Sequence, residues 1–137
     1  MAKQKLEMDS DPDITVIGIS CHENDYRLCW SINRSVGLEL TRRRMDITDV
    51  SNGIQASYSA YDHVDEPSQA RYTLVNNHCG DGILLRELRH ADFFLVVDNE
   101  LAENHPDLLD RVRGAEFVLT AFQLSYDQLK AGHKLLL

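Results

Sequence analysis

The chain has 137 residues, a length that suits one domain with a single hydrophobic core. Its hydrophobic and charged fractions, 43% and 26%, are ordinary for a globular protein and argue against disorder. The net charge of −8 disfavours binding to nucleic acid or to an anionic membrane. No stretch approaches the ~20 apolar residues of a membrane-spanning helix, and no secretory signal precedes the three cysteines. We therefore expect a cytoplasmic protein with reduced thiols.

The start of the chain predicts two strands before the first helix. Residues 5–8 alternate polar and apolar side chains, as a short edge strand does, and Asp9–Asp13 is predicted to turn at Pro12. Residues Ile14–Ser20, ITVIGIS, are β-branched and apolar on both faces. Such a run is typical of a strand buried on both sides, so we expect it at the centre of a sheet.

A helix is predicted to run to about Val36. Asn24 or Glu23 is a suitable N-cap, and Gly37 lies where many helices end in a left-handed residue. The apolar arc covers about half the circumference, so we expect the helix to be packed on more than one side. Asn33 projects into this arc, where its amide needs hydrogen-bond partners. The arc comprises Tyr26, Leu28, Cys29, Trp30, Ile32 and Val36, and the opposite side comprises Arg27, Ser31, Arg34 and Ser35.

The middle of the chain predicts an antiparallel hairpin. The dipeptide Asn52-Gly53 is a strong turn signal, and residues 54–61 alternate as in a half-exposed strand. Arg71–Asn76, RYTLVN, is the next predicted strand. The polar segment Asp62–Ala70 between them is expected to be a flexible loop, and its length permits antiparallel pairing.

The last third of the chain predicts two strands around a second helix. Asp92–Asp98, DFFLVVD, and Glu116–Leu124, EFVLTAFQL, are both apolar on two faces. Between them, Pro106 suits the first position of a helix that Asn104 or His105 would cap.

These elements predict one α+β domain spanning residues 1–137, with residues 1–12 flexible. The adjacent hairpin strands argue against a purely parallel sheet. We therefore expect a single mixed or mostly antiparallel sheet with two main helices packed on one face.

Residues 85–93, LRELRHADF, resemble the signature motif of the uncharacterised bacterial IPExxxVDY family. Glu87 and Asp92 match the motif at the right spacing, and Arg86 replaces its proline. The stretch 18–37 also resembles that family's first strand and helix. The resemblance implies a small bacterial cytoplasmic domain and implies no activity. The conservative departures from the motif are Leu85, Ala91 and Phe93.

Glu87 and Asp92 are the first candidates for a functional site. Two carboxyl groups in different environments can work as a general acid and a general base. We favour a structural role, in which Glu87 bonds backbone amides and Asp92 caps the turn before the strand. If the two acids instead line a ligand pocket near the strand ends, Tyr26 and Trp30 are its expected neighbours. Phe93 lacks the hydroxyl of the motif's tyrosine, so it cannot act as an acid.

Two cysteine–histidine pairs are candidate metal ligands. Cys21-His22 and His78-Cys79 each lie at a predicted strand end, and four zinc ligands would converge if these ends were adjacent. Neither pair has the C-x2-C spacing of a structural zinc site, so we expect no metal and no other cofactor. Cys21 also precedes a predicted helix N-terminus, which favours a thiolate. Its neighbour His22 would face the other way on a strand and is not placed to act as a base.

No complete catalytic motif occurs in the sequence. It contains no G-x-G-x-x-G, P-loop, H-E-x-x-H or G-x-S-x-G pattern. Arg42-Arg43-Arg44 is the one basic run, and in so acidic a chain we interpret it as a solvated surface segment instead of a phosphate site. No catalytic residue is assigned, and we expect a protein that is not an enzyme.

Two hypotheses for the function remain. The favoured one is a non-catalytic interaction or structural domain that forms a homodimer. Tyr58, Tyr61 and Tyr72 occupy positions expected to be exposed, and the apolar area of residues 135–137 should lie on the sheet or on a partner subunit. The alternative is a small-ligand-binding domain or weak enzyme with its site near the two motif acids.

Overall fold

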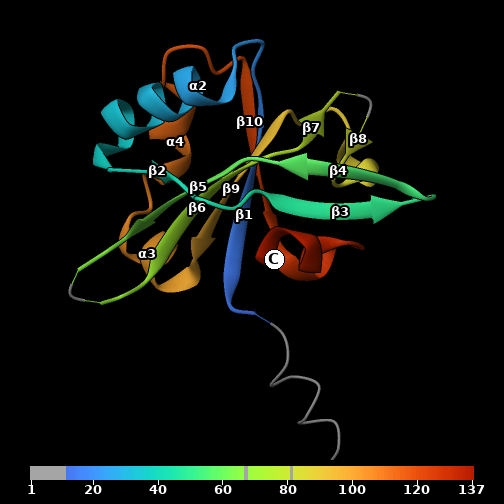
Figure 1. Ribbon diagram of the computed structural model, residues 1–137. Helices are drawn as coiled ribbons and strands as arrows, with labels where there is room; N and C mark the ends of the chain where they lie inside the picture. The colour runs from blue at the N-terminus through green and yellow to red at the C-terminus, as the bar shows by residue number, and fades with distance from the viewer. Residues whose placement is uncertain (1–11, 67, 81) are drawn as a thin grey trace, which may run out of the picture.

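The computed structural model describes residues 12–66, 68–80 and 82–137. Its main element is a six-stranded sheet in which every pairing of neighbours is antiparallel (Figure 1). The strand expected at residues 5–8 and the flexibility expected at 1–11 lie outside the described residues. The strands in spatial order are β10 (Thr120–Ser125), β1 (Ile14–Ser20), β9 (Phe93–Asp98), β6 (Arg71–Asn76), β5 (Ala60–Val64) and β2 (Thr41–Arg42). A two-stranded ladder pairs β7 (His78–Cys79) with β8 (Gly82–Ile83).

A longer hairpin projects beside the sheet (Figure 1). It pairs β3 (Ile47–Ser51) with β4 (Ile54–Tyr58). Asn52 and Gly53 both have positive φ, 54° and 77°, as a type I′ turn requires. The predicted turn is therefore confirmed. The single strand predicted after it is broken at Ser59 into β4 and β5.

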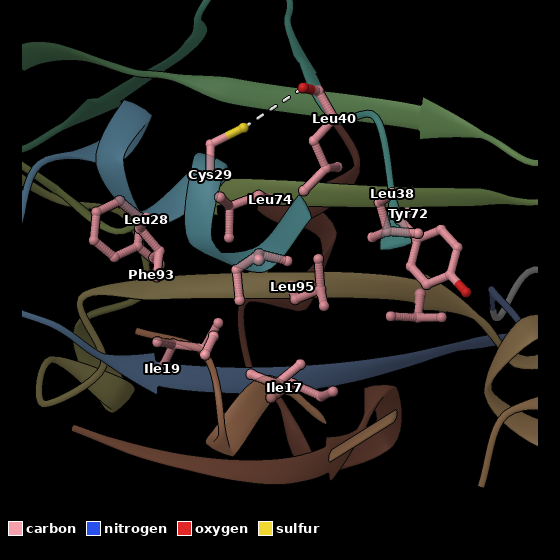
Figure 2. Packing of buried hydrophobic residues seen from close by; sticks show 14 of the residues in the cluster. Ile17, Ile19, Leu28, Cys29, Leu38, Leu40, Tyr72, Leu74, Phe93 and Leu95 are labelled. Carbon is pink, nitrogen blue, oxygen red and sulfur yellow. Dashed lines mark hydrogen bonds between the residues drawn. The ribbon is translucent and has the colours of Figure 1, made fainter. Parts of the chain in front are cut away.

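Helices cover one face of the sheet, so the predicted α+β class is confirmed (Figure 1). In the described part of the chain they are α2 (Asp25–Ile32), α3 (Asn99–Asn104) and α4 (Leu108–Arg113). Ile17 and Ile19 of β1 point into the core under these helices (Figure 2).

The opposite face of the sheet carries a second core. Ile14 and Val16 of β1 point into it, so β1 is buried on both faces and lies between two strands, as the sequence predicts. The hairpin β3–β4 covers this face together with two 3₁₀ turns, Arg86–Leu88 and Gly132–Leu136.

The caps predicted for the first helix are confirmed. The Asn24 side chain accepts a hydrogen bond from the Arg27 backbone N–H at 3.0 Å. The last turn, Asn33–Gly37, is π-helical and ends at Gly37 with φ of 86°. Asn33 finds the partners that its burial requires, because its amide bonds both the carbonyl (3.2 Å) and the N–H (2.8 Å) of Leu40.

The apolar arc predicted for the first helix is wrong at Tyr26, Trp30 and Ser31. Tyr26 and Trp30, assigned to the buried arc, are 65% and 48% exposed. Ser31, assigned to the polar side, is buried, and its hydroxyl bonds the Leu28 carbonyl at 3.0 Å. Ser31 lies toward the segment that follows α4, because it lines a hollow together with Gly114 and Ala115. The large aromatic residues are left exposed on the flank of the helix.

The second predicted helix begins later than expected. Pro106 lies in the connection before α4, and Asp107 occupies the N-cap position. His105 has an extended φ of −130°, which suits a residue that precedes proline. The residues before it form the separate helix α3, which the sequence analysis missed.

The last strand is shorter and less buried than predicted. β10 begins at Thr120 and is an edge strand, paired only with β1 among the described strands. Alternate residues turn their backbone groups outward at this edge. The carbonyl of Ala121 is bonded by Arg113 Nε at 3.0 Å, and the N–H of Ser125 by the Gln128 side chain at 2.7 Å.

The exposure predicted for three tyrosines is also wrong. Tyr58, Tyr61 and Tyr72 are buried, because the first faces the second core and the others face the core under the helices. Leu135 is buried in the second core, whereas Leu136 and Leu137 are exposed. No helix among the described residues is long and apolar enough to cross a membrane.

Candidate functional site

Glu87 ties the motif segment to the C-terminal part of the chain. It lies in the 3₁₀ turn Arg86–Leu88, and its carboxylate accepts hydrogen bonds from the backbone N–H groups of Lys130 and Ala131, the latter at 3.2 Å. Both carboxylate oxygens are therefore engaged by backbone.

Asp92 joins two neighbouring strands at their ends. Its Oδ2 accepts a hydrogen bond from the Cys21 backbone N–H at 2.8 Å, just after β1. Its Oδ1 lies 3.8 Å from His78 Nε2, whose nearer partner is the Arg89 carbonyl at 3.1 Å. The two motif acids thus bond different segments of backbone, and these contacts are the kind that a structural role requires.

The two cysteine–histidine pairs do not form a metal site in the described structure. Across residues 12–66, 68–80 and 82–137, no group of three or more His, Cys, Asp or Glu side chains is placed to hold a metal. Cys21 is buried, and its sulfur accepts the Glu23 backbone N–H at 3.3 Å.

Burial raises the pKa of the Cys21 thiol, against the lowering expected from the following helix. Desolvation outweighs the hydrogen bond at Glu23, so the thiolate that a nucleophile requires is disfavoured. Burial likewise raises the pKa of Cys29 to about 11. Cys79 is exposed.

Tyr26 and Trp30 do not lie with the motif acids. They line one side of a hollow of about 400 Å³, whose other side is formed by Glu116 and Phe117. A second hollow, of about 310 Å³, shares Trp30 and Glu116 with the first. The two hollows flank Trp30, and neither is lined by Glu87 or Asp92.

Two arginines stack on the aromatic rings of this surface. The Arg27 guanidinium lies 5.1 Å from the centre of the Phe117 ring, and that of Arg34 lies 5.4 Å from the Trp30 ring. We call the surface made by Tyr26, Arg27, Trp30, Arg34 and Phe117 the aromatic face. Each cation is attracted to a ring quadrupole, so the side chains hold one another in place.

Tyr26 and Trp30 were predicted as pocket residues beside Glu87 and Asp92, and they line a hollow with Phe117 instead. This residue was assigned to a strand, but it precedes β10 and has φ of 79°, an unusual value for a bulky side chain. The spacing of Tyr26 and Trp30, one turn apart on a helix, was the available signal.

The basic run is divided among different partners. Arg42 pairs with Asp46 at 3.0 Å, and Arg44 is exposed. The Arg43 guanidinium donates two hydrogen bonds to the Asp62 carboxylate, at 2.8 and 3.0 Å. It also donates one to the Leu137 carbonyl at 2.8 Å. The half-buried Arg43–Asp62 pair therefore joins the sheet to the C-terminal segment.

We expect Asp62→Asn to destabilise the protein by about 2 kcal/mol at pH 7, because it removes the charge of a hydrogen-bonded ion pair. Burial raises the pKa of Asp62, but hydrogen bonds from Arg43 and Thr73 outweigh it and hold the pKa below its usual value. The stabilisation is therefore present above the carboxyl's unfolded pKa and is lost as pH falls through the folded pKa. Urea unfolding at pH 7, 5 and 3 measures it.

Asp46→Asn is the matched control, because the Arg42–Asp46 pair is more exposed than the Arg43–Asp62 pair. We expect it to change stability by less than about 1 kcal/mol. An unchanged Asp62→Asn deficit between pH 7 and pH 3 would contradict the assigned ionisation.

A scan against protein-family models found no matching family. Searches of curated proteins and of solved structures likewise found no significant match.

Proposed function

We propose that the protein is a non-catalytic interaction domain that forms a homodimer through the aromatic face. The observation that carries the proposal is the exposure of Tyr26 and Trp30 on one flank of α2, beside two hollows. Trp, Tyr and Arg are the residues that most often dominate the binding energy of protein interfaces. A surface that gathers all three is suited to burial against another protein.

Shape supports a second copy of this chain as the occupant. Trp30 lies between the two hollows and lines both. In a twofold arrangement, a projecting side chain of each copy meets the same patch on the other. A Trp30 indole can then fill the partner's 400 Å³ hollow while its own hollow receives the partner's ring.

Charge also favours self-association at this face. The chain has a net charge of −8, so most of its surface repels a second copy. The charged residues lining the two hollows are Arg27, Arg34 and Glu116, which sum to +1. Repulsion between copies is therefore lower here than the net charge of the chain implies, although Glu23 pairs with Arg27 at 3.3 Å beside the face. A twofold arrangement can bring Glu116 of each copy toward an arginine of the other.

The aromatic face supplies the centre of an interface and not its whole area. Aromatic side chains bury about 150–250 Å² each, and a stable interface needs about 800 Å² from each partner. Tyr26 and Trp30 are 65% and 48% exposed and Phe117 is partly buried, so residues around the face must contribute the rest of the area.

We expect the wild-type protein to dimerise at micromolar concentration, and Trp30→Ala to weaken the dimer at least about tenfold, since a central tryptophan is a typical hot spot. Sedimentation velocity over a concentration series measures the equilibrium. Ile54→Ala is the control, because Ile54 is also an exposed apolar residue, at 68% against 48% for Trp30, but lies at the tip of the β3–β4 hairpin.

A wild-type monomer at high micromolar concentration would refute self-association. If Ile54→Ala dissociated the dimer and Trp30→Ala did not, the interface would lie elsewhere. Binding of a foreign protein to the aromatic face of a monomeric chain would identify a different occupant and would also overturn the homodimer.

The cytoplasmic location and the membership in the IPExxxVDY family belong to the same proposal. An exposed free thiol at Cys79 supports a reducing compartment. Glu87 and Asp92, the two motif identities, each hold backbone amides of another segment, which supports a shared structural role for the motif. Both carboxylates are engaged by backbone, so little supports a ligand site beside them. The aromatic face is better supported as the functional surface.

A further inference from the structure

A polar cavity of about 260 Å³ shares no residue with the aromatic face. It is formed where the β5–β6 hairpin, residues 36–38 and the start of α4 meet. Its apolar wall is Val36, Leu38 and Leu108. Its polar side chains are His63, Asp65, Tyr72, His105, Asp107 and Arg111.

Tyr72 presents an unpartnered hydroxyl to this cavity. The residue is only 4% exposed, and within the described part of the chain no hydrogen bond to its hydroxyl is formed. Figure 2 shows the oxygen pointing away from Leu74 and Leu95 in the core. Burial raises the pKa of Tyr72, and the nearby Asp65 raises it further, so the hydroxyl remains a donor at neutral pH. Among the described residues no fully buried side-chain nitrogen or oxygen lacks a partner, so solvent reaches this hydroxyl through the cavity. A hydroxyl on a cavity wall can donate a hydrogen bond to a bound molecule.

His63 supplies a second donor beside the first. Its Nδ1 accepts the Glu39 backbone N–H at 3.0 Å, which places the ring proton of the neutral imidazole on Nε2. Its ring lies 5.8 Å from that of Tyr72, at an angle of 60°. The two donors therefore lie on the same wall of the cavity.

The charged groups of the cavity largely cancel. Arg111 Nε donates to Asp107 Oδ2 at 2.7 Å, and the hydrogen bond from Arg111 holds the pKa of Asp107 below its usual value. Asp65 accepts the Ser68 hydroxyl at 2.8 Å. One arginine and two aspartates leave a net charge of −1, which disfavours an anionic ligand.

We propose that this cavity binds an uncharged polyhydroxyl compound of monosaccharide size. A hydroxyl group can both donate and accept a hydrogen bond. Neighbouring hydroxyls of the ligand can therefore donate to the Asp107 carboxylate and accept from the Arg111 guanidinium. Other hydroxyls of the ligand can accept from Tyr72 and His63. The apolar wall can take the C–H face of a sugar ring, in keeping with the mixed lining of small-molecule sites. The proposal does not rest on dimer formation, because the cavity and the aromatic face share no residue.

NMR titration of ¹⁵N-labelled protein with D-glucose, D-galactose and D-ribose tests the proposal, at up to about 50 mM because small neutral ligands bind weakly. We expect at least one sugar to shift the amide resonances around His63 and Arg111 in a saturable manner. Tyr72→Phe removes only the hydroxyl and is expected to weaken that binding about fivefold or more. Tyr26→Phe, on the aromatic face, is the matched control and should bind as the wild type does.

Three outcomes would overturn the proposal. They are the absence of saturable shifts with every sugar, equal binding by Tyr72→Phe, and saturation of the same resonances by acetate or phosphate in place of sugars. If Tyr72→Phe does not fold, Arg111→Gln on the exposed side of α4 replaces it, with the same expected loss.

Discussion

Replacing Asn77 with aspartate is expected to destabilise the protein by about 3–5 kcal/mol, lowering its melting temperature by roughly 10–15 °C. Asn77 is completely buried. Its amide nitrogen donates to the carbonyls of Leu88 (3.2 Å) and Ala91 (2.9 Å), and its amide oxygen accepts the Leu85 N–H at 2.7 Å. An aspartate keeps the shape but loses both donors and places a charge against two carbonyl oxygens.

The deficit of Asn77→Asp should shrink as pH falls. Burial among carbonyls raises the pKa of the introduced carboxyl, so the penalty is present above that pKa and is relieved as the group takes up a proton below it. Thermal unfolding at pH 7 and pH 5, compared with wild type at each pH, measures the change. Asn52→Asp, in the exposed type I′ turn, is the control and should change stability little, because Asp-Gly also suits this turn. A loss below about 3 °C for Asn77→Asp would contradict the assigned network.

Gly18→Ala is expected to destabilise the protein by about 1–3 kcal/mol, because no space exists for a methyl group on β1. An added Cβ would lie 2.5 Å from Phe122 Cζ and 2.9 Å from both Cε atoms of the same ring. Phe122 lies directly opposite Gly18 on β10, with its ring over the glycine. Urea unfolding of the purified variant measures the loss.

A double-mutant cycle isolates the contact. Phe122→Leu removes the ring that the new methyl group would meet, so Gly18→Ala should cost at least about 1 kcal/mol less in that background than in the wild type. Additive effects of the two substitutions would show that the methyl group is accommodated in some other way.

Local sequence patterns correctly predicted strands that carry apolar residues on both faces. β1 and β6 have the bounds expected from Ile14–Ser20 and Arg71–Asn76, because β-branched and apolar residues fill both faces of each. The Asn52-Gly53 turn was predictable because its geometry depends on two residues alone.

The errors lie where distant segments decide the outcome. The orientation of α2 depends on the sheet beneath it, so the pattern of the helix alone did not show that Tyr26 and Trp30 would be uncovered. Helix α3 has Leu101 as its one fully buried residue and thus no apolar repeat to reveal it. β10 was placed too early because the apolar run before Thr120 packs as a loop.

The candidate sites could not be predicted from the sequence, because they too are formed by segments that are distant along the chain. The polar cavity joins residues near 36, 63–72 and 105–111, which no spacing brings together. Asn77 lies directly after β6, and its side chain bonds the backbone of Leu85, Leu88 and Ala91 in the motif region. Neither role leaves a local pattern, since each depends on which strands pair.

The occupied outer edge of β10 has a consequence for the protein at high concentration. An open strand edge recruits further strands and so seeds aggregation. The side chains of Arg113 and Gln128 each bond one backbone group of this edge, the Ala121 carbonyl and the Ser125 N–H. Only a short stretch of backbone between these two residues is left to pair with another strand. A growing fibril would have to displace both side chains before it could add a strand. The β10 edge is therefore a poor template for polymerisation, even where two copies are brought together through the side chains of α2.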